Sequence, residues 1–157
     1  MFKNLFFSTL STSVSLIAAL EIQASKKPTN GTSFDQKCFD DNKIWSWFKE
    51  MSFDQRVDFC SMSKDERKFY EDNKMWTWFK ELSIDQRFIL CQLDPDSRKF
   101  YEDNKIWSWF KELTVNQRLQ LCALRSEQRK CYEDNKIWSW FKDLTFDERI
   151  TYCRGKK

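Results

Sequence analysis

The chain has 157 residues, of which 41% are hydrophobic, 17% aromatic and 32% charged, a composition typical of a folded protein. Its 27 basic and 24 acidic residues leave a net charge of +3, which does not favour a nucleic-acid partner because such proteins usually carry a strongly basic surface. The absence of His and the presence of only two Gly exclude the commonest general base, Gly-rich phosphate loops and nucleophile elbows, so no enzyme activity and no cofactor are predicted.

Residues 1–24 have the pattern of a secretory signal peptide. Lys3 gives a positively charged start, the stretch 5–20 is apolar and uncharged, and we place the cleavage site after Ala24. The apolar stretch is rich in Ser and Thr and shorter than the ~20 residues that span a membrane. An uncleaved membrane anchor and a mitochondrial presequence are the alternatives. We therefore expect a secreted protein, extracellular or periplasmic.

Residues 25–31 are predicted to be a linker, since they include Pro28 and Gly31. Asn30-Gly31-Thr32 has the form of a glycosylation acceptor, and an unmodified turn is the alternative.

Residues 32–155 repeat one sequence four times, at a fixed interval of 31 residues. The segment that starts Asp41-Asn42-Lys43-Ile44-Trp45 returns with small changes from Asp72, Asp103 and Asp134. Such a period indicates supersecondary units that bury their apolar faces by stacking on one another. We number the units one to four, over residues 32–62, 63–93, 94–124 and 125–155.

Each unit contains two helix-start signals. In unit two, Ser63 precedes Glu66 and Ser83 precedes Gln86, the spacing of a capping box, and in unit three Asp94-Pro95 is a further strong start. The sequence therefore predicts an all-α fold, an α-solenoid of four helix-turn-helix repeats preceded by a signal peptide. The predicted helices cover residues 35–51, 53–62, 64–82, 84–93, 95–113, 115–124, 126–144 and 146–154. Glu71-Asp72-Asn73 is a point where the helix over residues 64–82 could bend, since Asp and Asn favour caps over helix interiors.

The Trp pair of each unit is predicted to belong mostly to the core, because both rings fall on or beside the apolar face of the first helix, and stacking on a carbohydrate or another ligand is the alternative. Trp78 and its copies lie at the margin of that face and are expected to be the more exposed members. Asp72 and its copies Asp41, Asp103 and Asp134 fall inside the same face, where a carboxylate needs a partner. We expect either that this partner is the recurring Arg of the second helix, Arg87 in unit two, or that the Asp acts as a cap in each unit, while paired catalytic carboxylates are the less favoured alternative.

The six Cys of an exported chain indicate disulfides. Four recur in the second helices, and two extra ones occur only in the first and last units, each 22 residues before that unit's own Cys. Pairing Cys38 with Cys60 and Cys131 with Cys153 uses one geometry for both extra Cys. Cys91 and Cys122 are then expected to be buried thiols. Six reduced thiols in a cytosolic protein are the alternative, and the missing His and unpaired Cys spacing disfavour a metal site.

A row of polar residues, one Lys and one Asn from each unit, is the candidate binding surface. The row would follow one face of the solenoid, with a solvated face as the alternative reading. Its members are Lys43, Lys74, Lys105, Lys136, Asn42, Asn73, Asn104 and Asn135.

The sequence thus favours a secreted, non-catalytic helical-repeat protein that acts as a binding module for a protein or glycan partner. A membrane-active or toxin-like secreted protein is the alternative, since helices with an apolar face and Lys opposite can lie in a lipid interface. The capping boxes suit packed helices better than free amphipathic ones, so a membrane partner is not favoured.

Overall fold

The computed structural model describes residues 33–155, which are helical and contain no strand. The signal peptide, the linker and the Asn30 acceptor proposed above lie outside these residues. Within the described part of the chain, each unit has two longer helices and one short helix between them. The helices are α2 (Gln36–Asn42), α3 (Ser46–Lys49), α4 (Phe53–Ser61), α5 (Lys64–Asn73), α6 (Thr77–Lys80), α7 (Ile84–Gln92), α8 (Pro95–Asn104), α9 (Ser108–Lys111), α10 (Val115–Cys122), α11 (Ser126–Asn135), α12 (Ser139–Lys142) and α13 (Phe146–Arg154).

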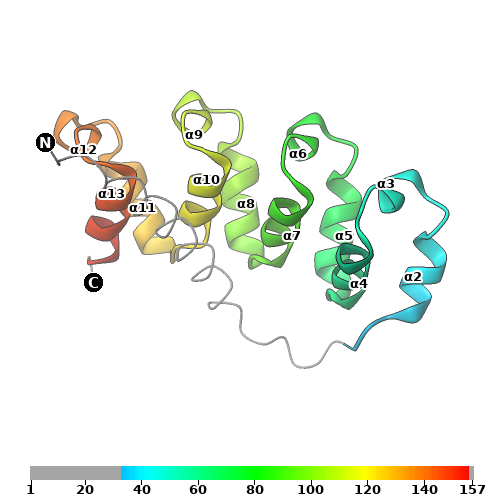
Figure 1. Ribbon diagram of the computed structural model, residues 1–157. Coiled ribbons are helices and arrows are strands. Elements are labelled where there is room, and N and C mark those ends of the chain that lie inside the picture. The colour runs from blue at the N-terminus through cyan, green and yellow to red at the C-terminus, as the bar shows by residue number, and fades with distance from the viewer. Residues whose placement is uncertain (1–32, 156–157) are drawn as a thin grey trace, which may run out of the picture.

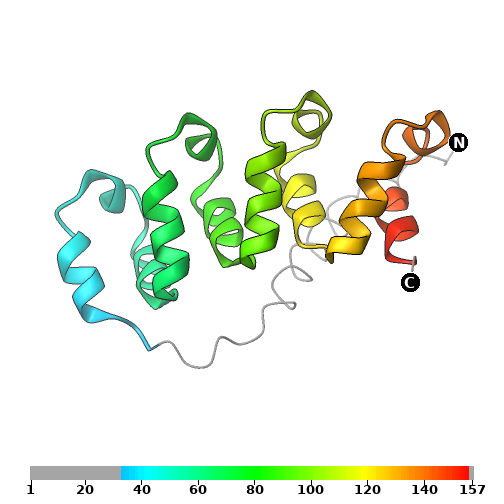
Figure 2. The ribbon, with the colours of Figure 1, turned by 180° about the vertical axis from the view of Figure 1, so that it is seen from behind.

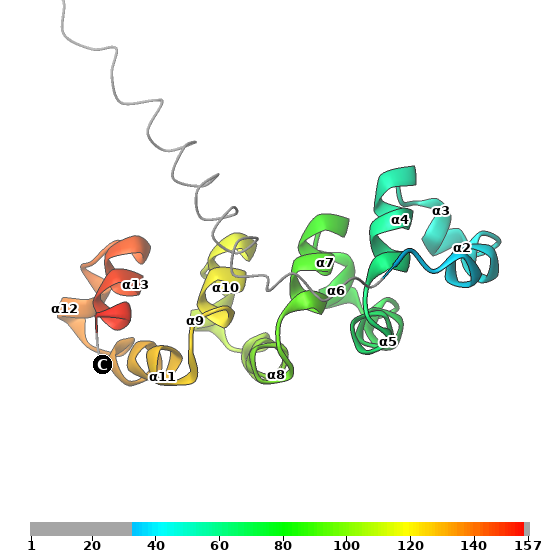
Figure 3. The ribbon, with the colours of Figure 1, turned by 90° about the horizontal axis from the view of Figure 1, so that it is seen from below.

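The four units lie side by side in one row (Figure 1). The first helices α5, α8 and α11 lie on one side of the row, and the second helices α4, α7, α10 and α13 lie on the other (Figure 3). The short helices α3, α6, α9 and α12 follow one edge, as the front and back views agree (Figures 1 and 2). No helix among residues 33–155 is both long and apolar enough to cross a membrane.

The second helices begin where the capping boxes predict. Ser83 accepts a hydrogen bond from the Gln86 N–H, and the Gln86 side chain accepts one from the Ser83 N–H. Ser52, Thr114 and Thr145 form the same reciprocal pair. Each pair satisfies two backbone donors that the helix itself leaves unbonded. The predicted bounds of these four helices agree with the structure to within two residues.

The first helices are interrupted, so the prediction of a single helix over residues 64–82 and its copies is wrong. In unit two, α5 ends at Asn73, whose side-chain amide donates to the Phe69 carbonyl at 2.9 Å. The Trp76 N–H then bonds the Asn73 carbonyl, and Trp76 has extended backbone angles before α6 begins. Asn competes with the helix for its own backbone groups, which favours a helix end.

Rings from the three helices of a unit, and from its neighbours, form the core. Phe79 at the centre of unit two is fully buried and meets Tyr70 edge to face, with 5.2 Å between ring centroids. The second Trp of one unit packs on the Tyr of the next, as Trp47 does on Tyr70 and Trp78 on Tyr101. Each such contact buries apolar area that neither unit covers alone, which is the cohesion expected of a repeat protein.

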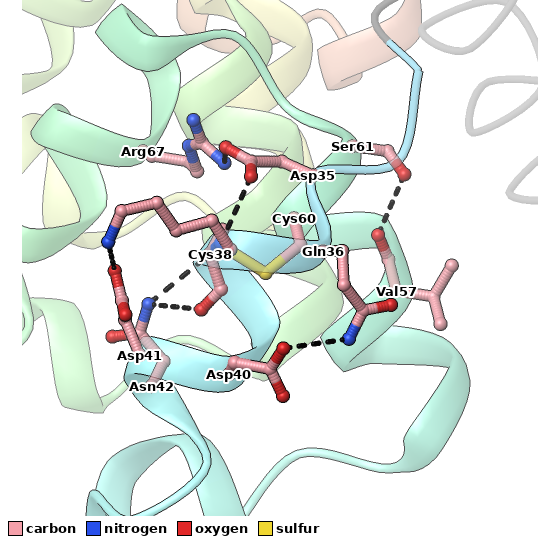
Figure 4. Close-up of a disulfide and its surroundings, with 11 residues drawn as sticks. Asp35, Gln36, Cys38, Asp40, Asp41, Asn42, Val57, Cys60, Ser61 and Arg67 are labelled. Atoms are coloured by element: carbon pink, nitrogen blue, oxygen red, sulfur yellow. Dashed lines mark hydrogen bonds and ion pairs between the residues drawn. A yellow bond between two sulfur atoms is a disulfide. The ribbon is translucent and has the colours of Figure 1, made fainter.

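Two disulfides join helices within the terminal units. Cys38–Cys60 links α2 to α4 (Figure 4), and Cys131–Cys153 links α11 to α13, each with 5.6 Å between Cα atoms. These are the two pairs proposed from the sequence. Cys91 and Cys122 are unbonded and fully buried, and burial raises the pKa of both thiols. A thiol that stays protonated and covered is a core side chain rather than a nucleophile.

Candidate functional site

The interruption of each first helix creates a corner, which we define as residues 43–45, 74–76, 105–107 and 136–138. Each corner joins a first helix to its short helix, so the four corners lie along the edge that carries α3, α6, α9 and α12 (Figure 1). In every unit the Asn directly before the corner donates its side-chain amide to the carbonyl four residues earlier, at 2.7 to 2.9 Å. The corners therefore have one repeated backbone geometry.

Large apolar side chains at these corners point into solvent. Trp45 is 54% exposed and Trp76 is 61% exposed, and the residue before each is more exposed still, up to 72% at Met75. We call the eight residues the Ile–Trp row: Ile44, Trp45, Met75, Trp76, Ile106, Trp107, Ile137 and Trp138. Soluble proteins seldom expose large apolar residues in a repeated pattern unless the surface contacts something.

In units one to three the two Trp occupy the opposite environments to those predicted. The first Trp is exposed, whereas Trp47, Trp78 and Trp109 are half-buried against the next unit. The prediction treated residues 64–82 as one continuous helix. The corner breaks that helix, so the directions in which Trp76 and Trp78 point differ from those in a continuous helix. Trp140, after which residues 33–155 contain no further unit, is also exposed, at 45%.

Most residues of the predicted Lys and Asn row make contacts within the protein itself. Lys74, Lys105 and Lys136 lie over the Trp47, Trp78 and Trp109 rings of the preceding units, 4.3, 4.7 and 4.2 Å from the ring centroids. Lys43 is exposed and pairs with Asp40 instead. Asn73 and Asn104 are buried, Asn42 and Asn135 are half-buried, and all four amides bond the backbone. The structure thus gives three Lys and four Asn a stabilising contact.

The recurring Arg of the second helix does not pair with the recurring Asp, so that prediction is wrong. Arg87 donates instead to three carbonyls at the end of α6, those of Phe79, Lys80 and Leu82, each at 3.0 Å. Arg56 makes the same three contacts in unit one, and Arg118 and Arg149 bond the two equivalent carbonyls of the short helix in theirs. A guanidinium carries several donors in a fixed plane and complements the negative end of a helix. We call this contact the Arg cap.

The recurring Asp pairs with a Lys on its own helix, in full solvent. Asp72 bonds Lys68 at 2.7 Å, and Asp41, Asp103 and Asp134 bond the Lys four residues earlier in the same way. These carboxylates point away from the core, so they neither pair with Arg nor converge on one another. Among residues 33–155 no group of His, Cys, Asp or Glu is placed to hold a metal ion.

The buried titratable groups also have structural partners. Burial raises the pKa of the Tyr70 and Tyr101 hydroxyls, against the opposing effect of Arg87 and Arg118 beside them. A phenol of raised pKa stays neutral, as its place between stacked rings requires. The repeated Lys, Asn, Arg, Asp and Tyr side chains thus have contacts within the protein that account for them. No such contact among the described residues accounts for the exposure of the Ile–Trp row.

Comparison with known proteins agrees with the repeat. A family model described as TMP repeat matches residues 42–51 and 135–144, which contain the corner and the short helix of the first and last units. Neither a curated protein nor a solved structure matches the chain. The repeated sequence, the helical units and these two matches together establish that the described part of the chain, residues 33–155, is an all-helical repeat.

Proposed function

We propose that the chain is a secreted, non-catalytic α-solenoid that acts as a binding module for a protein or glycan partner, and that the Ile–Trp row makes the contact. The observation that carries this proposal is the exposure of the same apolar pair at all four corners. Trp, with Tyr and Arg, is enriched among the residues that dominate binding energies. In a glycan complex, its flat face would stack on the apolar face of a sugar ring.

The corners support binding in a second way, because their backbone is held in place. The Asn73 amide bonds on one side of the corner and the Arg87 cap on the other fix the segment that carries Trp76. A preorganised side chain loses less conformational entropy when it binds. Four equal corners on one edge also allow a repetitive partner to bind several at once, which raises the overall affinity.

A variant with Ala at Trp45, Trp76, Trp107 and Trp138 is expected to lose partner binding while it stays folded, because these rings contribute little to the core. Captured proteins or glycans are compared between this variant and the parent by affinity capture followed by mass spectrometry. Circular dichroism checks the fold. In the matched control, Ala replaces Lys68 and Lys99, which are exposed and pair with Asp on their own helices. A partner that binds the four-Trp variant as well as the parent would contradict the proposal.

Secretion has a separate test. The protein recovered from the medium or the periplasm is expected to begin at Ser25, because the signal peptide is predicted to end at Ala24. N-terminal sequencing or intact mass gives this directly. A mature chain that keeps residues 1–24, or one found only in the cytosol, would remove the secreted part of the proposal and leave the binding surface untouched.

A membrane-active role is the second candidate, because charge at the corners favours it. Each of the segments 43–50, 74–81, 105–112 and 136–143 carries two Lys and one acid. Trp beside Lys suits the interface of an anionic lipid surface. Anionic vesicles that sediment with the parent, but not with the four-Trp variant, would favour this role over a protein or glycan partner.

A further inference from the structure

The joints between neighbouring units repeat the same aromatic contact. At each joint the second Trp of the earlier unit meets the Tyr of the later one, with 5.7 to 6.2 Å between ring centroids. The corner Lys of the later unit then lies over the same Trp. A cation over a Trp face and a tilted ring pair are both attractive arrangements. The earlier unit therefore contributes the Trp of each joint, and the later unit contributes the Tyr and the Lys.

Polar contacts accompany the rings at the joints. Arg67, Arg98 and Arg129 each pair with an Asp of the preceding unit: Asp35, Asp65 and Asp96. The Cys38 N–H and the Arg67 guanidinium lower the pKa of Asp35, which favours the ionised carboxylate (Figure 4).

The capping Gln of the second helix contributes a further polar contact, because its amide has two ends. The Gln55 oxygen caps its own helix at Ser52, while its nitrogen donates across the joint to Asp85 at 2.9 Å. Gln86 does the same toward Asn116 at 3.1 Å. The same side chain thus ends a helix and links two units.

The two ends of the row keep the aromatic residues of a joint but lack its two polar donors. Unit four ends in the exposed Trp140, and unit one begins with Phe39 and the exposed Lys43, which correspond to a joint Tyr and a joint Lys. However, the joint Arg is replaced by Gln36, and the capping Gln is replaced by Glu148.

With Glu at residue 148 in place of Gln, an attractive contact across a joint becomes a repulsive one. Glu148 still caps its helix, since its carboxylate accepts from the Thr145 N–H at 2.8 Å, and this bond lowers its pKa. A carboxylate has no N–H to donate, and the residue that it would meet on another copy is Asp54, the counterpart of Asp85. Two carboxylates facing each other repel. Lys43 pairs with Asp40 at 3.2 Å, and because this ion pair is exposed and weak, Lys43 can turn toward the Trp140 ring of another copy.

We propose that the two ends of the row are complementary halves of a joint for a second copy of this chain, and that Glu148 and Gln36 keep copies apart. Terminal units of repeat proteins need such protection, because an open end offers the surface on which the next unit would stack. A head-to-tail contact of this kind does not close on itself and would continue into a filament.

The test restores the internal residues at both ends with Q36R and E148Q in one full-length, oxidised chain. Sedimentation velocity over a concentration series is expected to show the parent as single chains and the double variant as a growing series of oligomers. At such a joint, Arg at residue 36 of the later copy would pair with Glu127 of the earlier copy, and Gln at residue 148 of the earlier copy would donate to Asp54 of the later one. Adding Lys43→Glu to the double variant should return it to single chains.

A matched control separates this joint from a general effect of charge. Asp72→Asn with Asp103→Asn raises the net charge by the same two units, at exposed positions that pair with Lys on their own helices. This control should stay a single chain. The proposal is overturned if the Q36R/E148Q chain stays single at every concentration, if the parent assembles equally well, or if Lys43→Glu leaves the oligomers intact.

Discussion

Replacing Arg87 with Ala is expected to lower the free energy of unfolding by about 3 kcal/mol, because hydrogen bonds to a charged group contribute about 1.5–3 kcal/mol and three carbonyls lose their donor. These carbonyls, of Phe79, Lys80 and Leu82, end the short helix α6. The guanidinium also lies over the buried Phe79 ring, 5.7 Å from its centroid. Urea unfolding followed by far-UV circular dichroism measures the change.

Arg87→Lys is the informative comparison for this prediction. Lys keeps the charge but lacks the planar set of donors that reaches three carbonyls at once. We expect it to recover only a small part of the lost stability, and Lys68→Ala, on the exposed surface, to change nothing measurable. Full recovery by Lys would mean that charge near the end of α6 matters and that the Arg geometry does not.

Removing the last disulfide by Cys131→Ala with Cys153→Ala is expected to cost about 3 kcal/mol, the stabilisation associated with closing a loop of this size. The link spans 22 residues and holds α11 against α13, in a unit that contacts one neighbouring unit among the described residues. The loss should be local, since each unit of a repeat protein depends chiefly on its neighbours. Hydrogen exchange should therefore show faster opening of α11 and α13 than of α8.

The unbonded thiols provide the control for that experiment. Cys91 and Cys122 are buried, so alkylation of the native protein should leave both unmodified, and alkylation after unfolding without reductant should modify these two alone. Modification of six thiols under the same conditions would contradict the disulfides. Equal exchange rates in α11 with and without Cys131–Cys153 would show that the link adds no stability to the last unit.

The sequence predicted the second helices well because their starts depend on local chemistry. Ser83 and Gln86 cap α7 through contacts three residues apart, and such contacts can be read from the chain alone. The repeat interval likewise predicted units that contact their neighbours. The same interval and the two extra Cys led to the Cys38–Cys60 and Cys131–Cys153 pairs found in the structure.

The sequence did not predict the corners, because a break in one helix changes the orientation of every side chain after it. Glu71-Asp72-Asn73 gave a signal for a bend, but a continuous helical wheel placed Trp76 in the core and Trp78 at its margin. The Arg cap was missed for a related reason, since carbonyls at the end of α6 exist as acceptors only once α6 is separate. Knowing that Asn73 ends a helix would have indicated both.

The two-ended Gln side chain has a consequence for how a chain of this kind changes length. Gln55 and Gln86 use the same atoms at successive joints, and the Trp, Tyr and Lys contacts are equally interchangeable. A duplicated copy of residues 63–93, inserted after the original, would meet residues it already fits on both sides. Gene duplication can thus lengthen the protein by whole units, adding one corner each time, while Gln36 and Glu148 keep their places at the extremities.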